Sequence, residues 1–512
     1  MISEKKNGEH LSGEHLSGKH LSGDVAKLQD LPVLGIEDFR SRVLDGVKQG
    51  GRISSFSGIS SDDSGTKILL VLAHDETGTL ETFTTRVIKA YDTLTTACPQ
   101  AHLFERELHE QWGIIPTGHP WLKPVRFPLD KKKSIENQPV VGVTDFFAMQ
   151  GNQVHEVAVG PVHAGIIEPG HFRFQCHGET VHHLEISLGY QHRGVEQALK
   201  GGPDLRTIHY FETLAGDTTI GHTTAGCTVI EALAGIDVPQ RGQMIRGIAA
   251  ELERMANHIG DLGAIAGDAG FLPTMSYCGR IRGDALNLTA VICGNRFGRG
   301  LVIPGGTFWD ITLDLIPVIQ TRLNDIEKDA TGAMDLMFNT PSVLARLEHT
   351  GKIEEEMART IGFVGPAARA SGLSRDVRAC HPYGIYHTQP VNVVVETFGD
   401  CFARAHVRWR EIQESLALIR TWLESLPPGP VSHPWEGRLC PGTTTTVLTE
   451  GWRGEICHTA ATDSQGKFLF YKVVDPSFHN WLGVSMALRN QQISDFPLCN
   501  KSFNLSYCGH DL

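Results

Sequence analysis

The sequence lacks closely paired cysteines. Its 11 cysteines are spread from Cys98 to Cys508, and no C-x-x-C occurs anywhere in the 512 residues. An odd number of cysteines without paired spacing describes no disulfide framework and is typical of a reducing compartment.

Long apolar runs and an excess of positive charge are also missing. No stretch approaches the roughly 18 apolar residues that a membrane span needs, and the N-terminus lacks the apolar core of a signal peptide, so we expect a cytoplasmic protein. The formal charge is −12, and long runs of Lys and Arg are absent. This balance excludes nucleic acid as a partner. The one basic cluster, at residues 131–133, is interpreted as part of a linker.

Common catalytic motifs are missing as well. The sequence contains no P-loop, no H-E-x-x-H and no G-x-S-x-G, and the glycines of GNRFGRG (294–300) do not follow a strand as a dinucleotide-binding motif requires. The 25 histidines do not change this, because a single histidine is more often a satisfied core or surface residue than a ligand. Pattern alone therefore names no activity.

The N-terminal residues have the composition of an unfolded arm. Residues 8–23 repeat GEHLSGEHLSGKHLSG, which is rich in Gly, Ser and His and poor in apolar side chains. We therefore expect residues 1–30 to be disordered. Metal binding through His10, His15 and His20 is the alternative for this repeat.

The rest of the chain has the composition of a folded protein, 41% hydrophobic and 20% charged, and is long enough for two or three domains. The β-rich run TKILLVLA (67–74) and a second candidate strand near 81–88 predict a small α/β domain over residues 31–128. Residues 129–150, which begin LDKKKSIENQP, have the charge and polarity of a linker.

Residues 151–512 are expected to form a large, mostly helical domain. In RGIAAELERMANHIGDLGAI (246–265), apolar residues recur at three- and four-residue spacings, which predicts a helix with one buried stripe. Glu251, Glu253 and Arg254 fall mostly off that stripe. A second helix is expected within 404–430, ending at Pro-Pro-Gly. The predicted fold class is α+β, a small α/β domain followed by a large helical one.

The order of several motifs adds a family resemblance. ERELHEQWGIIPTGHPWL (105–122) resembles the C subunit of bacterial complex I, and the blocks VGPVHAGIIEPGHFRFQCHGE (159–179) and LGYQHRGVEQAL (188–199) resemble the start of its D subunit. These two families are fused in membrane-bound hydrogenases of the formate hydrogenlyase type. ELERMANHIGDLGA, GDCFARAHVRWREIQESL and DPSFHNW follow in family order, so the resemblance covers about residues 100–512. It implies a hydrogenase large-subunit or D-subunit type of domain over 151–512.

In the hydrogenases that the chain resembles, four cysteinates hold a nickel–iron centre. FETLAGDTTIGH (211–222) matches the first cysteine pair with Glu212 and His222 kept, and SFNLSYCGHDL (502–512) matches the second pair. Alanine and glycine carry no ligand atom, and neutral hydroxyls are poor nickel donors. The resemblance therefore implies that this chain binds no metal at the four vacated positions, which are Ala215, Thr218, Ser506 and Gly509.

The D subunit of complex I has lost the same cysteines and uses the vacated cavity as the headgroup end of a quinone site. The resemblance therefore makes quinone a candidate occupant here. The quinone-binding Tyr and His of that family fall near Gly216 and Pro169, and neither is kept. Other polar contacts in the cavity are expected from Tyr507, Asp217, His222 and Asn504.

Three retained residues have roles in the families that the chain resembles. Glu196 matches a glutamate that passes protons away from nickel, and a partly desolvated carboxyl can have its pKa raised toward neutral. The alternative is a buried ion pair with a neighbouring arginine. His192 and Arg193 match residues that face the iron–sulfur cluster of a small partner subunit, and a solvated helix start is the alternative.

Two further groups are given no chemistry. Cys499 and Cys508 are expected to be isolated thiols rather than metal ligands. In the small domain, we expect a subunit interface to be shaped by Glu105, Arg106, His119 and Pro120.

The resemblance implies a fused C/D-type subunit of a complex I-like oxidoreductase. We expect it on the cytoplasmic side of the cell membrane, against a small iron–sulfur subunit, a ferredoxin-like subunit and ion-translocating membrane subunits. Electrons from the partner's cluster would reduce an acceptor such as quinone, with Glu196, Asp217 and His222 as candidates for proton transfer and Tyr507 in the cavity. A structural and coupling subunit without redox chemistry is the alternative, and an active nickel hydrogenase is the remote one.

Overall fold

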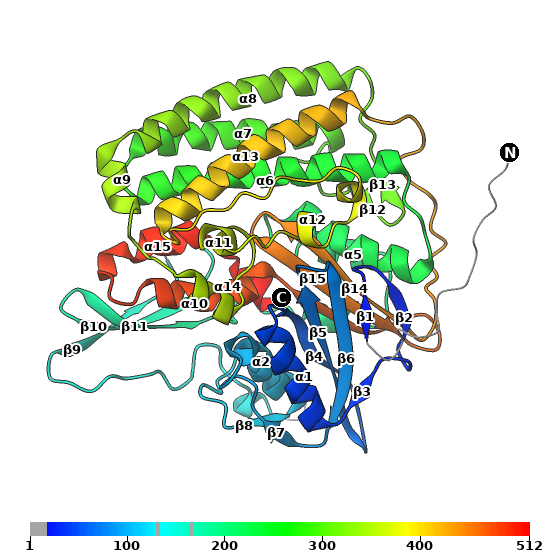
Figure 1. Cartoon of the computed structure of the whole chain (residues 1–512), viewed down its shortest axis with the longest axis vertical. Helices are drawn as coiled ribbons and strands as arrows, with labels where there is room; N and C mark the ends of the chain where they lie inside the picture. Colours follow the sequence, from blue (N-terminus) through cyan, green and yellow to red (C-terminus); the bar gives the residue numbers. More distant parts are fainter. Residues whose placement is uncertain (1–17, 130–133, 164–166) are drawn as a thin grey trace.

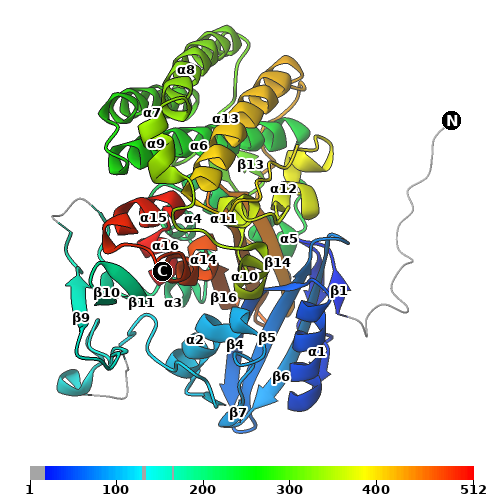
Figure 2. The same ribbon diagram turned by 60° about the vertical axis from the view of Figure 1, so that its left-hand side comes forward.

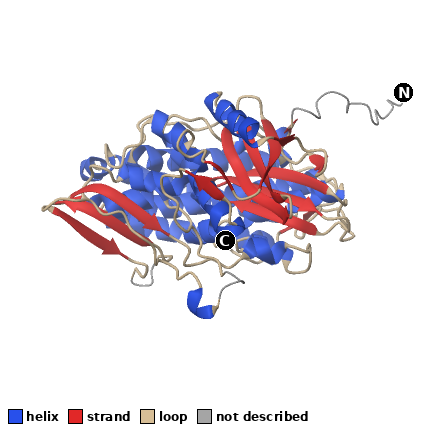
Figure 3. Cartoon of the chain, turned by 90° about the horizontal axis from the view of Figure 1, so that it is seen from below, coloured by secondary structure: helices blue, strands red, loops and turns tan. Residues whose placement is uncertain are grey.

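The computed structural model describes residues 18–129, 134–163 and 167–512. Long helices form a layer at one end of the molecule, and two sheets lie at the other end (Figure 1). A strand extension, β9–β11, projects to one side, and Figure 3 shows it apart from the other strands. Helices and strands are thus mixed, in agreement with the predicted α+β class.

The N-terminal sheet is an antiparallel meander covered by a helix. Strands β4 (Arg52–Asp62), β5 (Gly65–His74) and β6 (Thr79–Val87) pair in sequence order. The strands expected at 67–74 and near 81–88 correspond to β5 and β6. Phe39 and Val43 of the covering helix are buried. The other elements of this part are α1 (Ile36–Lys48), β3 (Val33–Leu34), β7 (Ala90–Asp92), η1 (Pro99–Ala101), α2 (His102–Trp112) and β8 (Ile115–Thr117).

The expectation of a disordered arm is wrong for residues 18–30. Strand β1 (Lys19–His20) pairs with β6, and β2 (Val25–Lys27) pairs with β14 (Thr443–Gly451) of the large domain. The segment is therefore ordered by backbone hydrogen bonds to the edges of two sheets, although it has little apolar surface to bury. His20 Nε2 lies 2.8 Å from the Thr82 hydroxyl in a hydrogen bond. His10 and His15 lie outside the described residues.

A second sheet, which the sequence did not predict, is built from β14, β15 (Gly454–Thr462) and β16 (Phe468–Val474). Nearly all residues of β14 and β15 are buried. Leu448 and Phe470 belong to the same buried cluster as Phe39 and Leu72 of the N-terminal sheet. The small and the large parts of the chain therefore share a hydrophobic core.

The helical layer contains the two predicted helices. They are α6 (Gln240–Asp268) and α13 (Cys401–Glu424), and α13 ends before the Pro-Pro-Gly sequence. Packed beside them are α7 (Leu272–Cys293) and α8 (Leu315–Phe338). One expectation is wrong: Glu251 and Arg254 were placed off the buried stripe, yet they are 0% and 1% exposed. Helix α6 is buried on several faces. Its buried charged residues form ion pairs with charged residues of neighbouring elements.

The remaining elements connect these layers (Figure 2). Residues 134–153 form turns and the short helix η2 (Ile135–Asn137), and the basic residues 131–133 lie outside the described part. The other elements are β9 (Val154–Val159), β10 (His171–His177), β11 (Thr180–Ser187), α3 (Val195–Leu199), α4 (Thr207–Glu212), α5 (Thr219–Ala234), β12 (Val302–Ile303), β13 (Gly306–Thr307), α9 (Pro341–Leu347), α10 (Glu355–Ile361), α11 (Gly365–Ala370), α12 (Val377–Cys380), η3 (Gly384–His387), α14 (Pro476–Ala487), η4 (Ile493–Asp495), α15 (Phe496–Phe503) and α16 (Tyr507–Asp511). Among the described residues, each helix is too short or too polar to cross a membrane.

Candidate functional site

The two segments predicted to flank a common cavity do meet in the fold. The loop 213–218 leads into α5, and residues 506–509 begin α16. The Arg193 guanidinium donates to the carbonyls of Thr213 at 2.6 Å and Leu214 at 2.9 Å on the first segment, and to that of Cys508 at 3.2 Å on the second. Arg193 therefore joins the segments through their backbones, while its side chain stays exposed on the surface.

The side chains at the four positions that match the hydrogenase cysteines do not fit a nickel centre. None offers a thiolate, and all four residues are buried: Ala215, Thr218, Ser506 and Gly509. Ser506 instead caps α16, because its hydroxyl accepts a hydrogen bond from the Gly509 N–H at 2.9 Å. A Cβ atom at Gly509 would lie 2.6 Å from Asp475 Oδ2. Across the described parts of the chain, no three His, Cys, Asp or Glu side chains converge as metal ligands.

The cysteine nearest these positions is a neutral thiol. The Sγ atom of Cys508 lies 3.4 Å from the Ser506 hydroxyl. Burial, reinforced by the nearby Glu168 carboxylate, raises the pKa of Cys508 to about 11. Cys499 is buried elsewhere, next to Cys401. The two thiols therefore have different neighbours, and Cys499 lies against a second thiol rather than alone.

Asp217 of the first segment forms an ion pair with Arg453, which lies in the turn between β14 and β15. The pair is bidentate, with contacts of 2.6 and 2.9 Å. The same guanidinium donates from Nε to the Asn504 carbonyl at 2.5 Å and lies 3.8 Å from the Trp452 ring centre. Burial raises the pKa of Asp217, but Arg453 outweighs it and holds the pKa below its ordinary value. Asp217 is therefore a fixed carboxylate rather than a free proton carrier.

His222 belongs to a buried row of polar side chains beneath Gly509. Its Nε2 donates to Asp475 Oδ2 at 3.0 Å, and its Nδ1 lies 3.2 Å from His458 Nε2. His458 Nδ1 in turn lies 2.9 Å from the Tyr471 hydroxyl. Every donor has an acceptor when both rings are neutral: the Tyr471 hydroxyl then donates to His458, His458 donates to His222, and His222 donates to Asp475. Burial lowers the pKa of His458 well below its ordinary value, which favours the neutral form of that ring.

Glu196 lies in a row of alternating charges between the two parts of the chain. Its side chain is 15% exposed and contacts Lys472 Nζ at 2.9 Å, and it accepts the Val473 N–H at 3.0 Å. Lys472 also donates to both oxygens of Glu107, at 2.6 and 2.7 Å, and Arg126 pairs with the same glutamate. The ion-pair partner of Glu196 is therefore a lysine, not the arginine considered in the sequence.

The other predicted site residues have mainly structural contacts. His192 Nδ1 donates to the Asp511 carbonyl at 2.7 Å, which fixes the loop before α3 to the C-terminal segment. Tyr507 is 6% exposed, and its ring packs at 4.8 Å against Trp481. Gly216, where the family's quinone-binding tyrosine falls, is exposed, with open space where a Cβ would be.

The expected interface residues are partly internal. Glu105 is 0% exposed and accepts hydrogen bonds from Tyr91, at 2.8 Å, and from the backbone N–H of Leu94, also at 2.8 Å. Arg106 donates to two backbone carbonyls of the chain itself, at 2.8 and 2.7 Å. The interface prediction is therefore wrong for Glu105 and Arg106, whose contacts lie within the chain.

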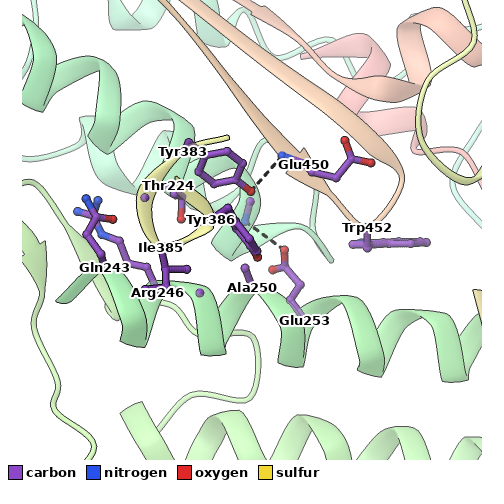
Figure 4. Close-up of a pocket in the computed structure, with 13 residues that line it drawn as sticks. Thr224, Gln243, Arg246, Ala250, Glu253, Tyr383, Ile385, Tyr386, Glu450 and Trp452 are labelled. Atoms are coloured by element: carbon purple, nitrogen blue, oxygen red, sulfur yellow. Dashed lines mark hydrogen bonds between the residues drawn. The ribbon is translucent and has the colours of Figure 1, made fainter. Parts of the chain in front are cut away.

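A small pocket that the sequence did not predict lies between α5, α6, η3 and β14. Glu253, Arg246, Tyr383 and Tyr386 line it together with Trp452 (Figure 4). The one sequence feature that could have indicated this pocket was Glu253, a glutamate inside a helix whose other residues are largely buried. Residues 383–386 approach α6 from far along the chain, and no spacing rule predicts that approach.

The comparisons with known proteins agree with this architecture. Residues 268–439 match the family described as respiratory-chain NADH dehydrogenase, 49 Kd subunit, and residues 44–139 match the 30 Kd subunit of the same enzyme. Formate hydrogenlyase subunit 5 of Escherichia coli (strain K12) is 30% identical over 437 residues, covering 81% of this chain and 76% of the relative.

Two subunits of NADH-quinone oxidoreductases are also similar to this chain. The D subunit from Clostridium beijerinckii is 34% identical over 259 residues, covering 50% of this chain and 70% of the relative. The fused C/D subunit from Bacteroides thetaiotaomicron is 28% identical over 412 residues, covering 73% of this chain and 76% of the relative. The chain therefore belongs to the family of complex I 49 kDa subunits and related hydrogenase subunits, and carries a 30 kDa-type domain fused ahead of that part.

Proposed function

We propose that the chain is the fused C/D-type subunit of a membrane-associated, complex I-like oxidoreductase that works without a nickel centre. The observation that carries the proposal is the meeting of the segments 213–218 and 506–509, which Arg193 joins and which offer no thiolate at the four matched positions. Electrons would come from the iron–sulfur cluster of a small partner subunit. A ferredoxin-like subunit and ion-translocating membrane subunits would complete the complex on the cytoplasmic side.

Quinone is the acceptor that we propose for the vacated cavity. Support comes from the open space at Gly216 and from the Asp217–Arg453 ion pair next to it in the chain. A fixed guanidinium stabilises negative charge that develops on an acceptor during reduction. Glu196 would exchange protons along the row formed with Lys472 and Glu107, since its carboxyl is the part of that row with the greatest access to solvent.

A coupling subunit without redox chemistry is the second candidate. It is favoured by the packing of Asp475 against Gly509 and of Arg453 against Asn504, which reduces the space between the segments. Such a subunit would transmit motion between partners without reducing an acceptor. An active nickel hydrogenase is the least favoured function, because the donor set at the four vacated positions does not suit nickel.

The test is metal analysis and a quinone-reductase assay on the intact purified complex. We expect no stoichiometric nickel and measurable quinone reduction, with Glu196→Gln lowering the rate by about 10²-fold or more, the scale of a lost proton-transfer group. Glu424→Gln, an exposed change at the end of α13, is the control and should retain the wild-type rate. Stoichiometric nickel would overturn the proposal, and a complex that reduces no quinone with any donor would be the coupling subunit.

A further inference from the structure

Glu253 is a carboxyl group without a charged partner, in a region where the other acids are paired. Its oxygens accept the backbone N–H groups of Ile220 at 2.7 Å and Gly221 at 3.1 Å, at the start of α5. None of the basic side chains that the structure describes forms an ion pair with it. By contrast, Glu251 on the same helix contacts Arg378 at 3.0 Å and Arg254 at 3.2 Å.

The carboxyl faces a small pocket lined by both polar and apolar groups. Figure 4 shows Glu253 directed up from α6 toward the start of α5, below Tyr386. The volume available to the centres of water molecules is about 20 Å³, and that is enough for a water molecule. The Thr224 hydroxyl on the pocket wall is buried and lacks a hydrogen-bond partner in the described structure. A water bound there would satisfy it and would give Glu253 a source of protons.

The pocket lies close to the region around Asp217 where the proposed function places the acceptor. A Cβ at Gly221 would lie 3.5 Å from Glu253 Oε1 and 3.1 Å from Thr218 Cγ2, so Glu253 is close to a position that matches a hydrogenase cysteine. The Asn257 amide donates to the carbonyls of both Asp217, at 2.9 Å, and Glu253, at 3.0 Å. Trp452 lines the pocket and donates to the Asp217 carbonyl at 3.0 Å. A charge in the cavity therefore acts on Glu253 over a short distance.

Electrostatics makes Glu253 sensitive to that charge. Burial raises its pKa, the two N–H groups lower it, the Asp217 carboxylate raises it and Arg254 lowers it, with a resulting value of about 8. Additional negative charge in the cavity raises the pKa further, because like charges disfavour the ionised form. Near and above pH 8, arrival of an electron would therefore draw a proton onto Glu253.

Of the two carboxyl groups described in the pocket lining, Glu253 is the one without an ion pair. Glu450 of β14 also lines the pocket and has a pKa raised by burial to about 7, but its oxygens bind Arg369 at 2.8 Å and the Val377 N–H at 3.0 Å. The Tyr386 hydroxyl donates to Glu251 at 2.6 Å, and the Tyr383 hydroxyl accepts the Glu450 N–H at 3.1 Å. Arg246 is paired with Glu231.

We infer that Glu253 is the proton-uptake group of the vacated cavity: its carboxylate binds one proton from pocket water when negative charge enters the cavity, and releases it when that charge leaves. The electron is the one that the proposed function assigns to the partner's cluster, and the inference rests on that function for its physiological role. The O–H bond at Glu253 forms as an O–H bond of the pocket water breaks, and that water regains a proton by exchange with solvent.

The first test is an infrared pH titration of the purified complex, followed through the carbonyl stretch of protonated carboxylic acids. We expect a band that titrates near pH 8, disappears in Glu253→Gln and persists in Glu253→Asp and in the exposed control Glu424→Gln. Glutamine keeps an oxygen that accepts from the start of α5, and aspartate keeps the acid. A spectrum in which the glutamine variant loses no titrating band would overturn the inference.

The second test measures coupling without turnover. Asp217→Asn removes a negative charge that raises the pKa of Glu253, so the Glu253 band should titrate at a lower pH. An unchanged titration would show that Glu253 does not sense the cavity, and the inference would be wrong whether or not quinone is reduced.

The third test is the pH dependence of quinone reduction. Above about pH 8 the wild-type rate should fall, because the Glu253 carboxylate adds negative charge beside the acceptor, whereas the glutamine variant should stay nearly flat. A fall of equal size in both enzymes would contradict the inference. If the wild-type complex reduces no quinone but both infrared results hold, the proposed function fails and the proton site remains.

Discussion

Gly509 determines what the C-terminal segment can hold. A Cβ at this position would lie 2.6 Å from Asp475 Oδ2. Asp475 has little freedom to withdraw, because it is 1% exposed and accepts hydrogen bonds from His222 at 3.0 Å and from the Ser477 N–H at 2.8 Å. Any side chain at position 509, cysteine included, therefore disturbs a buried carboxylate and its partners.

A single methyl group tests this packing. Gly509→Ala should lower the free energy of unfolding by about 1–3 kcal/mol, the usual result of overpacking a buried site. Gly279→Ala is the matched control, because Gly279 lies inside α7 with open space where the Cβ would be. That change should be neutral or stabilising by up to about 1 kcal/mol. Equal unfolding midpoints for the two variants in urea would show that Asp475 moves freely.

The sequence identified positions in the site but not their bonding partners. Asp217 and His222 were predicted to contact the cavity, and they do lie at or beneath the junction of the two segments. Their partners, Arg453 and Asp475, come from parts of the chain more than 230 residues away. Spacing along a chain carries information about one helix or strand, and none about which distant charge will face it.

At the scale of elements, regular patterns were predicted and irregular ones were not. The apolar period of α6 and the strong runs of β5 and β6 gave correct helix and strand predictions. Strands β14 and β15 are buried along nearly their whole length, so the alternation of apolar and polar residues that identifies a half-buried strand is absent. Strand β2 was missed because its stability comes from pairing with β14 rather than from apolar content.

The β2 strand predicts a measurable effect of truncation. A variant that begins at residue 31 should unfold at a lower temperature than one that begins at residue 18. It loses hydrogen bonds that include Gly23 N–H to Thr446 O at 2.8 Å and Leu448 N–H to the Ser22 hydroxyl at 2.8 Å. Each is worth about 0.5–1.5 kcal/mol. Thermal unfolding followed by circular dichroism is the measurement, and identical midpoints would mean that β2 contributes nothing to the large sheet.

At the scale of the whole molecule, the two fused parts are held together by charge as well as by their shared core. Glu107 comes from α2 of the N-terminal part, Lys472 from β16 and Glu196 from α3 of the large part. Glu107 and Lys472 are 2% and 1% exposed. Removing one member of such a buried pair leaves an uncompensated charge, which costs far more than the pair itself contributes.

Lys472→Met should therefore weaken the junction. We expect a loss of about 3–5 kcal/mol in the free energy of unfolding, whereas Lys467→Met, an exposed change just before β16, should stay within about 0.5 kcal/mol.

Burial raises the pKa of Glu107, but Arg126 and Lys472 hold it below its ordinary value. Its contribution to stability is then present above the ordinary glutamate pKa of about 4.3 and is lost as the pH falls below it. Without Lys472 the pKa of Glu107 rises, so acid unfolding of the methionine variant should begin at a higher pH than in the wild type. If the two proteins unfold over the same pH range, Arg126 alone compensates Glu107 and the lysine is not part of the junction.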